Sequence, residues 1–110
     1  MTPRELYDAL KKVQEPKGYF FNKDREFVLD MMQALLTNKE RYGYMNCPCR
    51  LASGDRSKDA DIICPCAYRA ADVAQYGACY CALYVSAAWN EGKLPNEYVP
   101  ERRPPEKMAF

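Results

Sequence analysis

Apolar residues at helical spacing open the chain. Three of them lie three or four positions apart and mark one face of a helix: Leu6, Leu10 and Val13. Ahead of them, Thr2 and Glu5 stand in the positions of a capping box, with Pro3 at the favoured first helical position. Pro16 and Gly18 then stop the pattern. We therefore predict a first helix that begins after Thr2 and ends near Pro16.

A longer amphipathic pattern follows. Its apolar stripe consists of six residues: Phe27, Val28, Met31, Met32, Leu35 and Leu36. Asn22 is placed to cap a helix that begins at about Lys23, and Gly43 marks the end of this helix after Tyr42. We expect the stripe to face the core. A Met-rich groove that binds a partner is the alternative use of the same residues.

Beyond the second helix the apolar runs become shorter. Residues 51–63 are polar and turn-rich, with room for one short helical turn. The alanine-rich stretch 67–76 predicts a third helix that Gly77 closes, and Ser86 can cap a short fourth helix through Trp89. Since no stretch alternates strongly with period two, the sequence predicts no sheet.

The pattern as a whole predicts a mostly α fold, a small compact helical domain. We place this single domain at residues 1–92. We assign residues 93–110 to a Pro-rich C-terminal tail, which we expect to extend over the surface or to be partly disordered.

Composition narrows the class of protein. The 110 residues contain 16 Lys+Arg against 15 Asp+Glu, a net charge of +1, which gives no support to a nucleic-acid partner. The first residues lack the apolar region of a secretory signal, and no apolar run approaches the roughly 20 residues of a membrane span. We therefore expect a cytoplasmic protein without a membrane partner.

All six cysteines fall in three Cys-x-Cys pairs: Cys47-Pro48-Cys49, Cys64-Pro65-Cys66 and Cys79-Tyr80-Cys81. In a reducing compartment such clustering indicates metal-binding or catalytic thiols rather than structural disulfides. Four thiolates can hold a metal centre, and two more can form a redox disulfide. Because a bridge within one pair is strained, any disulfide should link different pairs. Iron and zinc both accept four sulfurs, although zinc motifs usually have longer spacing.

In the order of these three pairs, the chain resembles the catalytic (beta) subunit of ferredoxin:thioredoxin reductase. The similarity extends upstream to Gly18-Tyr19-Phe20-Phe21 before the long helix and to Tyr42-Gly43 before the first pair. It covers roughly residues 15–90. The gaps of fourteen residues after Cys49 and twelve after Cys66 differ from the plant-type pattern. The chain thus resembles a divergent archaeal-type or anaerobic-bacterial-type ferredoxin-dependent disulfide reductase.

The resemblance implies a helical domain wrapped around a [4Fe–4S] cluster beside a redox-active disulfide. Carried over by position, the cluster ligands are Cys47, Cys64, Cys66 and Cys79. The other two cysteines form the disulfide: Cys49 as the exposed thiol that attacks the target, and Cys81 as the thiol that faces the cluster.

The implied reaction is reduction of thioredoxin, or of a thioredoxin- or glutaredoxin-like protein, by ferredoxin in two one-electron steps. Plant-type ferredoxins lie near about −400 mV and thioredoxin near about −270 mV, so the two-electron reaction is downhill by roughly 6 kcal/mol. The plant-type enzymes also pair with a variable subunit, which we do not expect here.

One position departs from the plant and cyanobacterial members, whose third pair is Cys-His-Cys. This chain has Tyr80 there and contains no histidine. We count Tyr80 among the catalytic candidates, as a hydrogen-bond or proton donor to a forming thiolate, although a phenol with a pKa near about 10 is a weak acid at neutral pH. A packing role is the alternative. We expect Arg50 and Arg69 beside the pairs to be solvated surface charges; the alternative is that they lower the pKa values of the thiols or contact an acidic ferredoxin.

Two other classes of function compete with the reductase. The first is a structural zinc or iron–sulfur module that binds a protein without turnover and leaves Cys49 and Cys81 expendable. The second is an electron carrier without disulfide chemistry.

Overall fold

The computed structural model describes residues 1–108, of which about half are helical. Its four α-helices are α1 (Pro3–Gln14), α2 (Arg25–Tyr42), α3 (Arg69–Tyr76) and α4 (Ala87–Asn90). Its two short strands are β1 (Phe20–Phe21) and β2 (Tyr84–Val85). Short 3-10 turns occur at Glu15–Lys17, Ala60–Ile62 and Pro105–Lys107. The predicted helical class is therefore confirmed, with long loops making up most of the rest.

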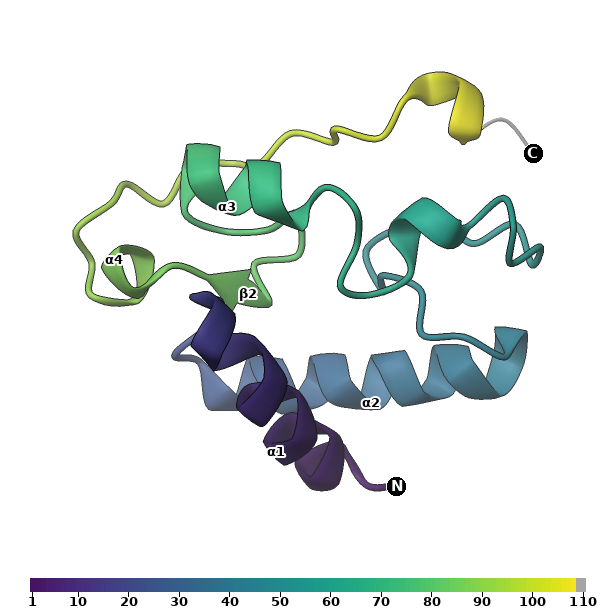
Figure 1. The fold of residues 1–110 in the computed structure, drawn as a ribbon, viewed down its shortest axis with the longest axis horizontal. Coiled ribbons are helices and arrows are strands. Elements are labelled where there is room, and N and C mark those ends of the chain that lie inside the picture. The colour runs from purple at the N-terminus through teal and green to yellow at the C-terminus, as the bar shows by residue number, and fades with distance from the viewer. Residues whose placement is uncertain (109–110) are drawn as a thin grey trace.

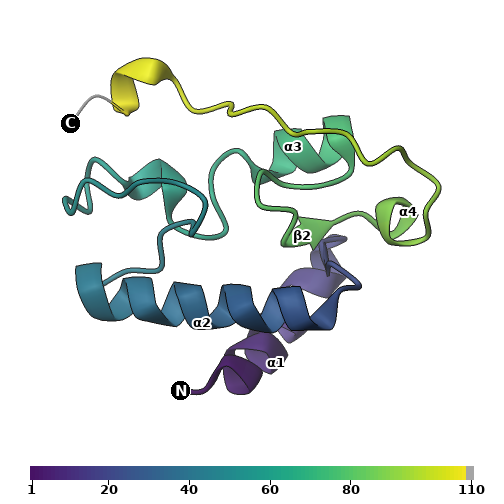
Figure 2. The same cartoon turned by 180° about the vertical axis from the view of Figure 1, so that it is seen from behind.

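The long helix α2 lies along one edge of the molecule, and α1 packs across it (Figure 1). The C-terminal segment follows the opposite edge, over α3. The view from behind shows the loops that connect α2, α3 and β2 between these two edges (Figure 2). Of the helices in the described part of the chain, none combines the length and apolar character needed to cross a membrane.

The predicted start of α1 is confirmed. Glu5 N donates to Thr2 Oγ1 at 3.1 Å and Thr2 N donates to Glu5 Oε1 at 3.0 Å, which completes the capping box. Leu6 is buried in the core. After the helix and its 3-10 turn, Gly18 adopts a left-handed conformation with φ of 89° and turns the chain toward β1.

The apolar stripe of α2 faces the core as predicted, with Val28, Met32 and Leu35 fully buried. The predicted cap at Asn22 is wrong. Asp24 caps the helix by accepting a hydrogen bond from Phe27 N at 3.1 Å. The Asn22 side chain accepts from Asp24 N and also donates to Ala82 O at 3.0 Å, so it ties the helix entry to the loop that follows the third cysteine pair.

The third and fourth helices form close to where the sequence placed them. Helix α3 begins two residues later than predicted and ends before Gly77, and Ser86 caps α4 by accepting from Trp89 N at 3.2 Å. The absence of a sheet was predicted wrongly. β1 pairs antiparallel with β2, with Phe21 opposite Tyr84. Strands of two residues are too short to show an alternating pattern, so no period-two signal could predict them.

The described part of the C-terminal segment, residues 93–108, is largely extended, which is one of the two predicted states, and it is also anchored. Val99 and Arg103 are buried. Arg103 Nε donates to Asp61 Oδ2 at 2.9 Å, and Arg102 Nε donates to Asp72 Oδ1 at 2.8 Å. Contacts thus continue past residue 92, and the segment packs against the same body as the helices.

Candidate functional site

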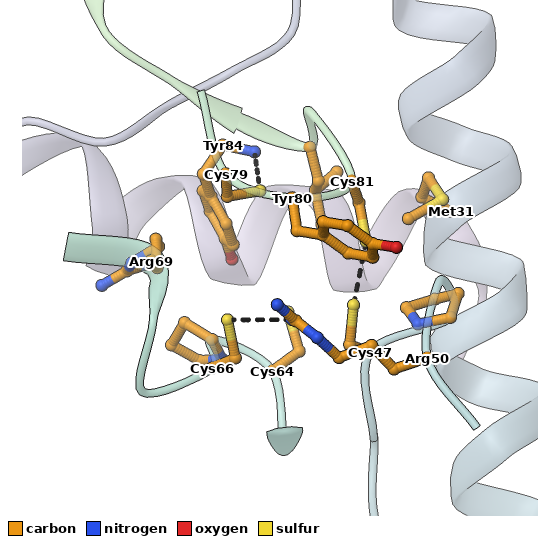
Figure 3. A pocket seen from close by; sticks show the side chains of 13 residues that line it. Met31, Cys47, Arg50, Cys64, Cys66, Arg69, Cys79, Tyr80, Cys81 and Tyr84 are labelled. Atoms are coloured by element: carbon orange, nitrogen blue, oxygen red, sulfur yellow. Dashed lines mark hydrogen bonds between the residues drawn. The ribbon is translucent and has the colours of Figure 1, made fainter. Parts of the chain in front are cut away.

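The three Cys-x-Cys pairs converge on one pocket. Five of the six cysteines line it: Cys47, Cys64, Cys66, Cys79 and Cys81 (Figure 3). Met31 of α2 and Leu83 and Tyr84 at β2 contribute much of the remaining wall. The structure therefore brings together all four residues that were expected as cluster ligands.

Backbone hydrogen bonds hold the first two pairs side by side. Cys47 N donates to Ile62 O at 2.7 Å, and Cys64 N donates to Met45 O at 2.8 Å. These bonds flank an isolated antiparallel bridge between Asn46 and Ile63. The two loops can therefore present their thiols to the same space, although a long turn-rich segment separates them in the sequence.

The third pair is fastened to β2. Cys79 N donates to Tyr84 O at 2.9 Å, and Ala82 N donates to Cys79 O at 2.8 Å, which closes a tight turn around Tyr80 and Cys81. Ala82 completes this turn with a φ of 59°, a left-handed conformation that non-glycine residues rarely adopt. The turn is held by its hydrogen bonds to the sheet, including the one from Asn22 to Ala82 O.

The thiols of the pocket differ in their surroundings. Cys47 and Cys79 are buried, whereas Cys49 is exposed. Burial raises the pKa of the Cys64 and Cys79 thiols, because a buried thiolate loses its hydration. All six cysteines are free thiols in this structure.

Two of the sulfur atoms lie within hydrogen-bonding distance. The Sγ atoms of Cys47 and Cys81 are 2.9 Å apart. Hydrogen bonds from Cys47 and Cys81 hold the pKa of the Cys49 thiol well below its usual range. Cys81 therefore belongs to the pocket wall and at the same time influences the ionisation of the exposed Cys49.

Arg50 is not the solvated surface charge that we expected, because its side chain is buried. Its Nε and Nη2 atoms donate to Glu101 at 2.8 Å each, and Nη1 lies 3.4 Å from Cys66 Sγ. The guanidinium also lies 4.5 Å from the ring centroid of Tyr80. Its carboxylate partner stands 51 positions further along the chain, outside the reach of local sequence patterns.

Tyr80 lies between the pocket and the outside. It is half-buried, and burial raises the pKa of its hydroxyl. It lines the cysteine pocket and also an outer groove, whose walls are Cys49, Arg50, Leu51, Tyr80, Glu101, Arg103 and Met108. The exposed thiol of Cys49 therefore opens onto a surface that the C-terminal segment helps to form.

Arg69 lines the pocket too and was likewise misplaced as a surface charge. Its Nη1 donates to Gln14 Oε1 at 2.7 Å, and its guanidinium lies 3.8 Å from the ring centroid of Tyr19 and 4.8 Å from that of Tyr84. The sequence does not single out Tyr84 or Gln14 as site residues, because neither belongs to a recognisable motif. Tyr84 N also donates to Cys79 Sγ at 3.4 Å.

Comparison with known families supports the resemblance that the cysteine pattern indicated. The family model described as ferredoxin thioredoxin reductase catalytic beta chain matches residues 4–103. The chain belongs to this family. The match includes all three cysteine pairs and continues through Arg103 of the C-terminal segment. Among curated proteins, no sequence matches the chain.

Family membership has two direct consequences. The family is one of oxidoreductases of the ferredoxin:thioredoxin reductase type, and its name points to ferredoxin and thioredoxin as partners. The family is also associated with iron–sulfur chemistry, in which cysteine thiolates are the usual ligands.

Proposed function

We propose that this chain is a ferredoxin-dependent disulfide reductase that reduces thioredoxin or a thioredoxin- or glutaredoxin-like protein. In this proposal a [4Fe–4S] cluster fills the cysteine pocket and works with the thiols of Cys49 and Cys81. The position of Cys81 carries the proposal. Its sulfur lies in the pocket wall, 2.9 Å from that of Cys47, and its thiol also helps to lower the pKa of the exposed Cys49. A thiol pair so placed can connect a buried redox group to a disulfide outside.

The chemistry of the pocket fits an iron–sulfur cluster. Five thiols share one pocket, and thiolates are the usual ligands of such clusters. Within residues 1–108, no three His, Cys, Asp or Glu side chains gather closely enough to bind a single metal ion. The five thiols lie around the walls of this pocket. The buried Tyr84 hydroxyl, which lacks a hydrogen-bond partner among these residues, supplies an orphaned polar atom in the same wall.

The ligands in this proposal are Cys47, Cys64, Cys66 and Cys79. When bound, the cluster supplies one-electron chemistry beside a disulfide whose opening needs two electrons. Arg50 Nη1, at 3.4 Å from Cys66 Sγ, contributes positive charge that favours thiolate ligation there. Leu83 and Tyr84, both buried, keep water away from the inner wall.

Two reduced ferredoxins deliver two electrons, and with two protons these convert a Cys49–Cys81 disulfide to two thiols. The thiolate of Cys49 then attacks the target disulfide, which forms a mixed disulfide and releases the first target thiol. The thiolate of Cys81 attacks the Cys49 sulfur, which releases the second target thiol and restores the Cys49–Cys81 disulfide. We assign Tyr80 a supporting role as a proton donor beside this pair.

The first test is the content of iron, acid-labile sulfide and zinc in protein purified without oxygen. The proposal expects about four irons and four sulfides per chain. One zinc and no sulfide, in protein made with ample iron, would overturn it and favour a structural module.

A second test separates the reductase from an electron carrier. In Cys49→Ser the proposal expects an intact cluster, together with loss of ferredoxin-driven thioredoxin reduction. A carrier would instead pass electrons from ferredoxin to an artificial acceptor and show no disulfide reduction even before the substitution.

A further inference from the structure

Tyr84 places an unpartnered hydroxyl in the wall of the cysteine pocket. The residue is 1% exposed, and its hydroxyl has no hydrogen-bond partner among residues 1–108. A buried phenol hydroxyl is usually paired, because its donor loses water on burial. Figure 3 shows the ring reaching down from β2, with its oxygen directed into the pocket on the side of Arg69, Cys64 and Cys66. The orphaned donor therefore points at the space where a bound group would lie.

Packing holds this ring in place. Its centroid lies 5.3 Å from that of Phe21, and Phe21 stacks in turn on Tyr7 at 4.8 Å. The guanidinium of Arg69 covers the ring at 4.8 Å. The backbone of Tyr84 is paired with Phe21 across the small sheet and donates to Cys79 Sγ at 3.4 Å. With both backbone and ring fixed, the hydroxyl cannot turn to solvent for a partner.

We propose that the Tyr84 hydroxyl donates a hydrogen bond to a sulfur atom of the [4Fe–4S] cluster and thereby raises its reduction potential. This inference rests on the proposed function, since it requires the cluster. Adding an electron makes the sulfurs more negative, so a donor stabilises the reduced state more than the oxidised state. Tyr84 is a tuning residue in this account and does not take part in the thiol exchange of Cys49 and Cys81.

The test compares two phenol-to-phenyl substitutions in the same aromatic stack. Tyr84→Phe removes the hydroxyl in the pocket, and Tyr7→Phe removes one at the far end of the stack. Iron and sulfide are measured first, and the midpoint potential is then followed by an EPR-monitored redox titration. In Tyr84→Phe we expect the equilibrium constant for reduction of the cluster to fall about tenfold, which is a shift of the midpoint potential by about 59 mV to a more negative value for one electron. Tyr7→Phe should leave the potential unchanged.

A second variant covers the case in which Tyr84→Phe assembles no cluster. Incorporation of 3-fluorotyrosine at position 84 preserves the shape of the ring and makes the hydroxyl a stronger donor, so the potential should move to a more positive value. A fully loaded protein whose potential does not move in either variant overturns the inference. Absence of iron and sulfide from the unmodified protein is a different result, because it overturns the proposed function itself.

Discussion

The two ends of the cysteine pocket differ in their exposure. The open end contains the exposed Cys49 together with the half-buried Cys81 and Tyr80, and it adjoins the outer groove. The covered end consists of Cys79, Leu83, Tyr84 and Arg69, of which the first three are buried. A reductase that passes electrons from a cluster to an outside disulfide needs both: an accessible thiol at one end and exclusion of water at the other.

Each end also contains one arginine, and the two are held by different contacts. Arg50 at the open end is fixed by the Glu101 carboxylate from the C-terminal segment. Arg69 at the covered end is fixed by the neutral amide of Gln14 and by aromatic faces. Arg50 is therefore held by a partner distant in the sequence, and the open end should be the more sensitive to changes in the C-terminal segment.

The largest effects should come from substitution of the cysteines, and the property that is lost should differ between the two ends of the pocket. Cys79→Ser at the covered end should remove a ligand and lower the iron and sulfide content. Cys49→Ser at the open end should leave both contents unchanged and reduce disulfide reduction to background. Metal analysis and a ferredoxin-driven thioredoxin assay measure the two losses. If Cys79→Ser kept a full cluster, the ligand assignment would be wrong.

The next largest effect should come from Arg103, which anchors the C-terminal segment. Its side chain is buried and contacts Asp61 at 2.9 Å and Asp59 at 3.8 Å. Burial works against ionisation of Asp61, but hydrogen bonds from Tyr68 and Arg103 outweigh it and hold its pKa below the usual range. Arg103→Met removes the only cation that pairs with these two carboxylates in the described part of the chain.

We expect Arg103→Met to lower the free energy of unfolding by about 3–5 kcal/mol, the cost of leaving buried charges unpaired. Urea unfolding under anaerobic conditions measures this change. The exposed Arg56, in the neighbouring loop, supplies the control, and Arg56→Met should change stability by less than about 0.5 kcal/mol. Equal losses in the two variants would show that the segment is not anchored through Arg103.

An intermediate effect is expected for Glu101→Gln, which keeps the shape of the side chain and removes its charge. Arg50 would then remain buried with a weaker partner, at a cost of about 1.5–3 kcal/mol. Hydrogen exchange of the loop around Cys49 and Arg50 should increase, while exchange around β2 should stay the same. The exposed Glu97→Gln is the matched control. Increased exchange at β2 as well would mean that the two ends are not independent.

Much of the fold could be predicted because its signals are local. The capping box at Thr2 and the glycine after α2 depend on residues within a few positions of one another, and both are confirmed. The convergence of the cysteines was implied by a family pattern, and the family match confirms that recognition. Short-range stereochemistry and a specific motif are the kinds of information that a single sequence carries.

Three of the missed features depend on partners that are distant in the sequence. Arg50 contacts a residue 51 positions away, Arg69 one 55 positions away, and Asn22 one 60 positions away. When only its neighbours in the sequence are considered, each of these side chains looks like a solvent-exposed polar residue or a helix cap. The role of Tyr84 in the wall was also hidden, because its burial follows from pairing with β1. The polar contacts that shape the site become visible only in three dimensions.

The smallest effect should come from Tyr80→Phe at the open end. The substitution keeps the ring that lies 4.5 Å from the Arg50 guanidinium and removes only the hydroxyl. If that hydroxyl supplies a proton beside Cys49 and Cys81, thioredoxin reduction should slow by about tenfold, less than the 10²–10⁴-fold of an efficient general acid because a phenol is poorly matched to neutral pH. Cluster content and midpoint potential should not change. Steady-state turnover at neutral pH measures the effect. An unchanged rate would mean that the Tyr80 hydroxyl donates no proton and that the ring acts only through its contact with Arg50. In that case Tyr80→Ala should lower the stability of the protein without a specific loss of disulfide reduction.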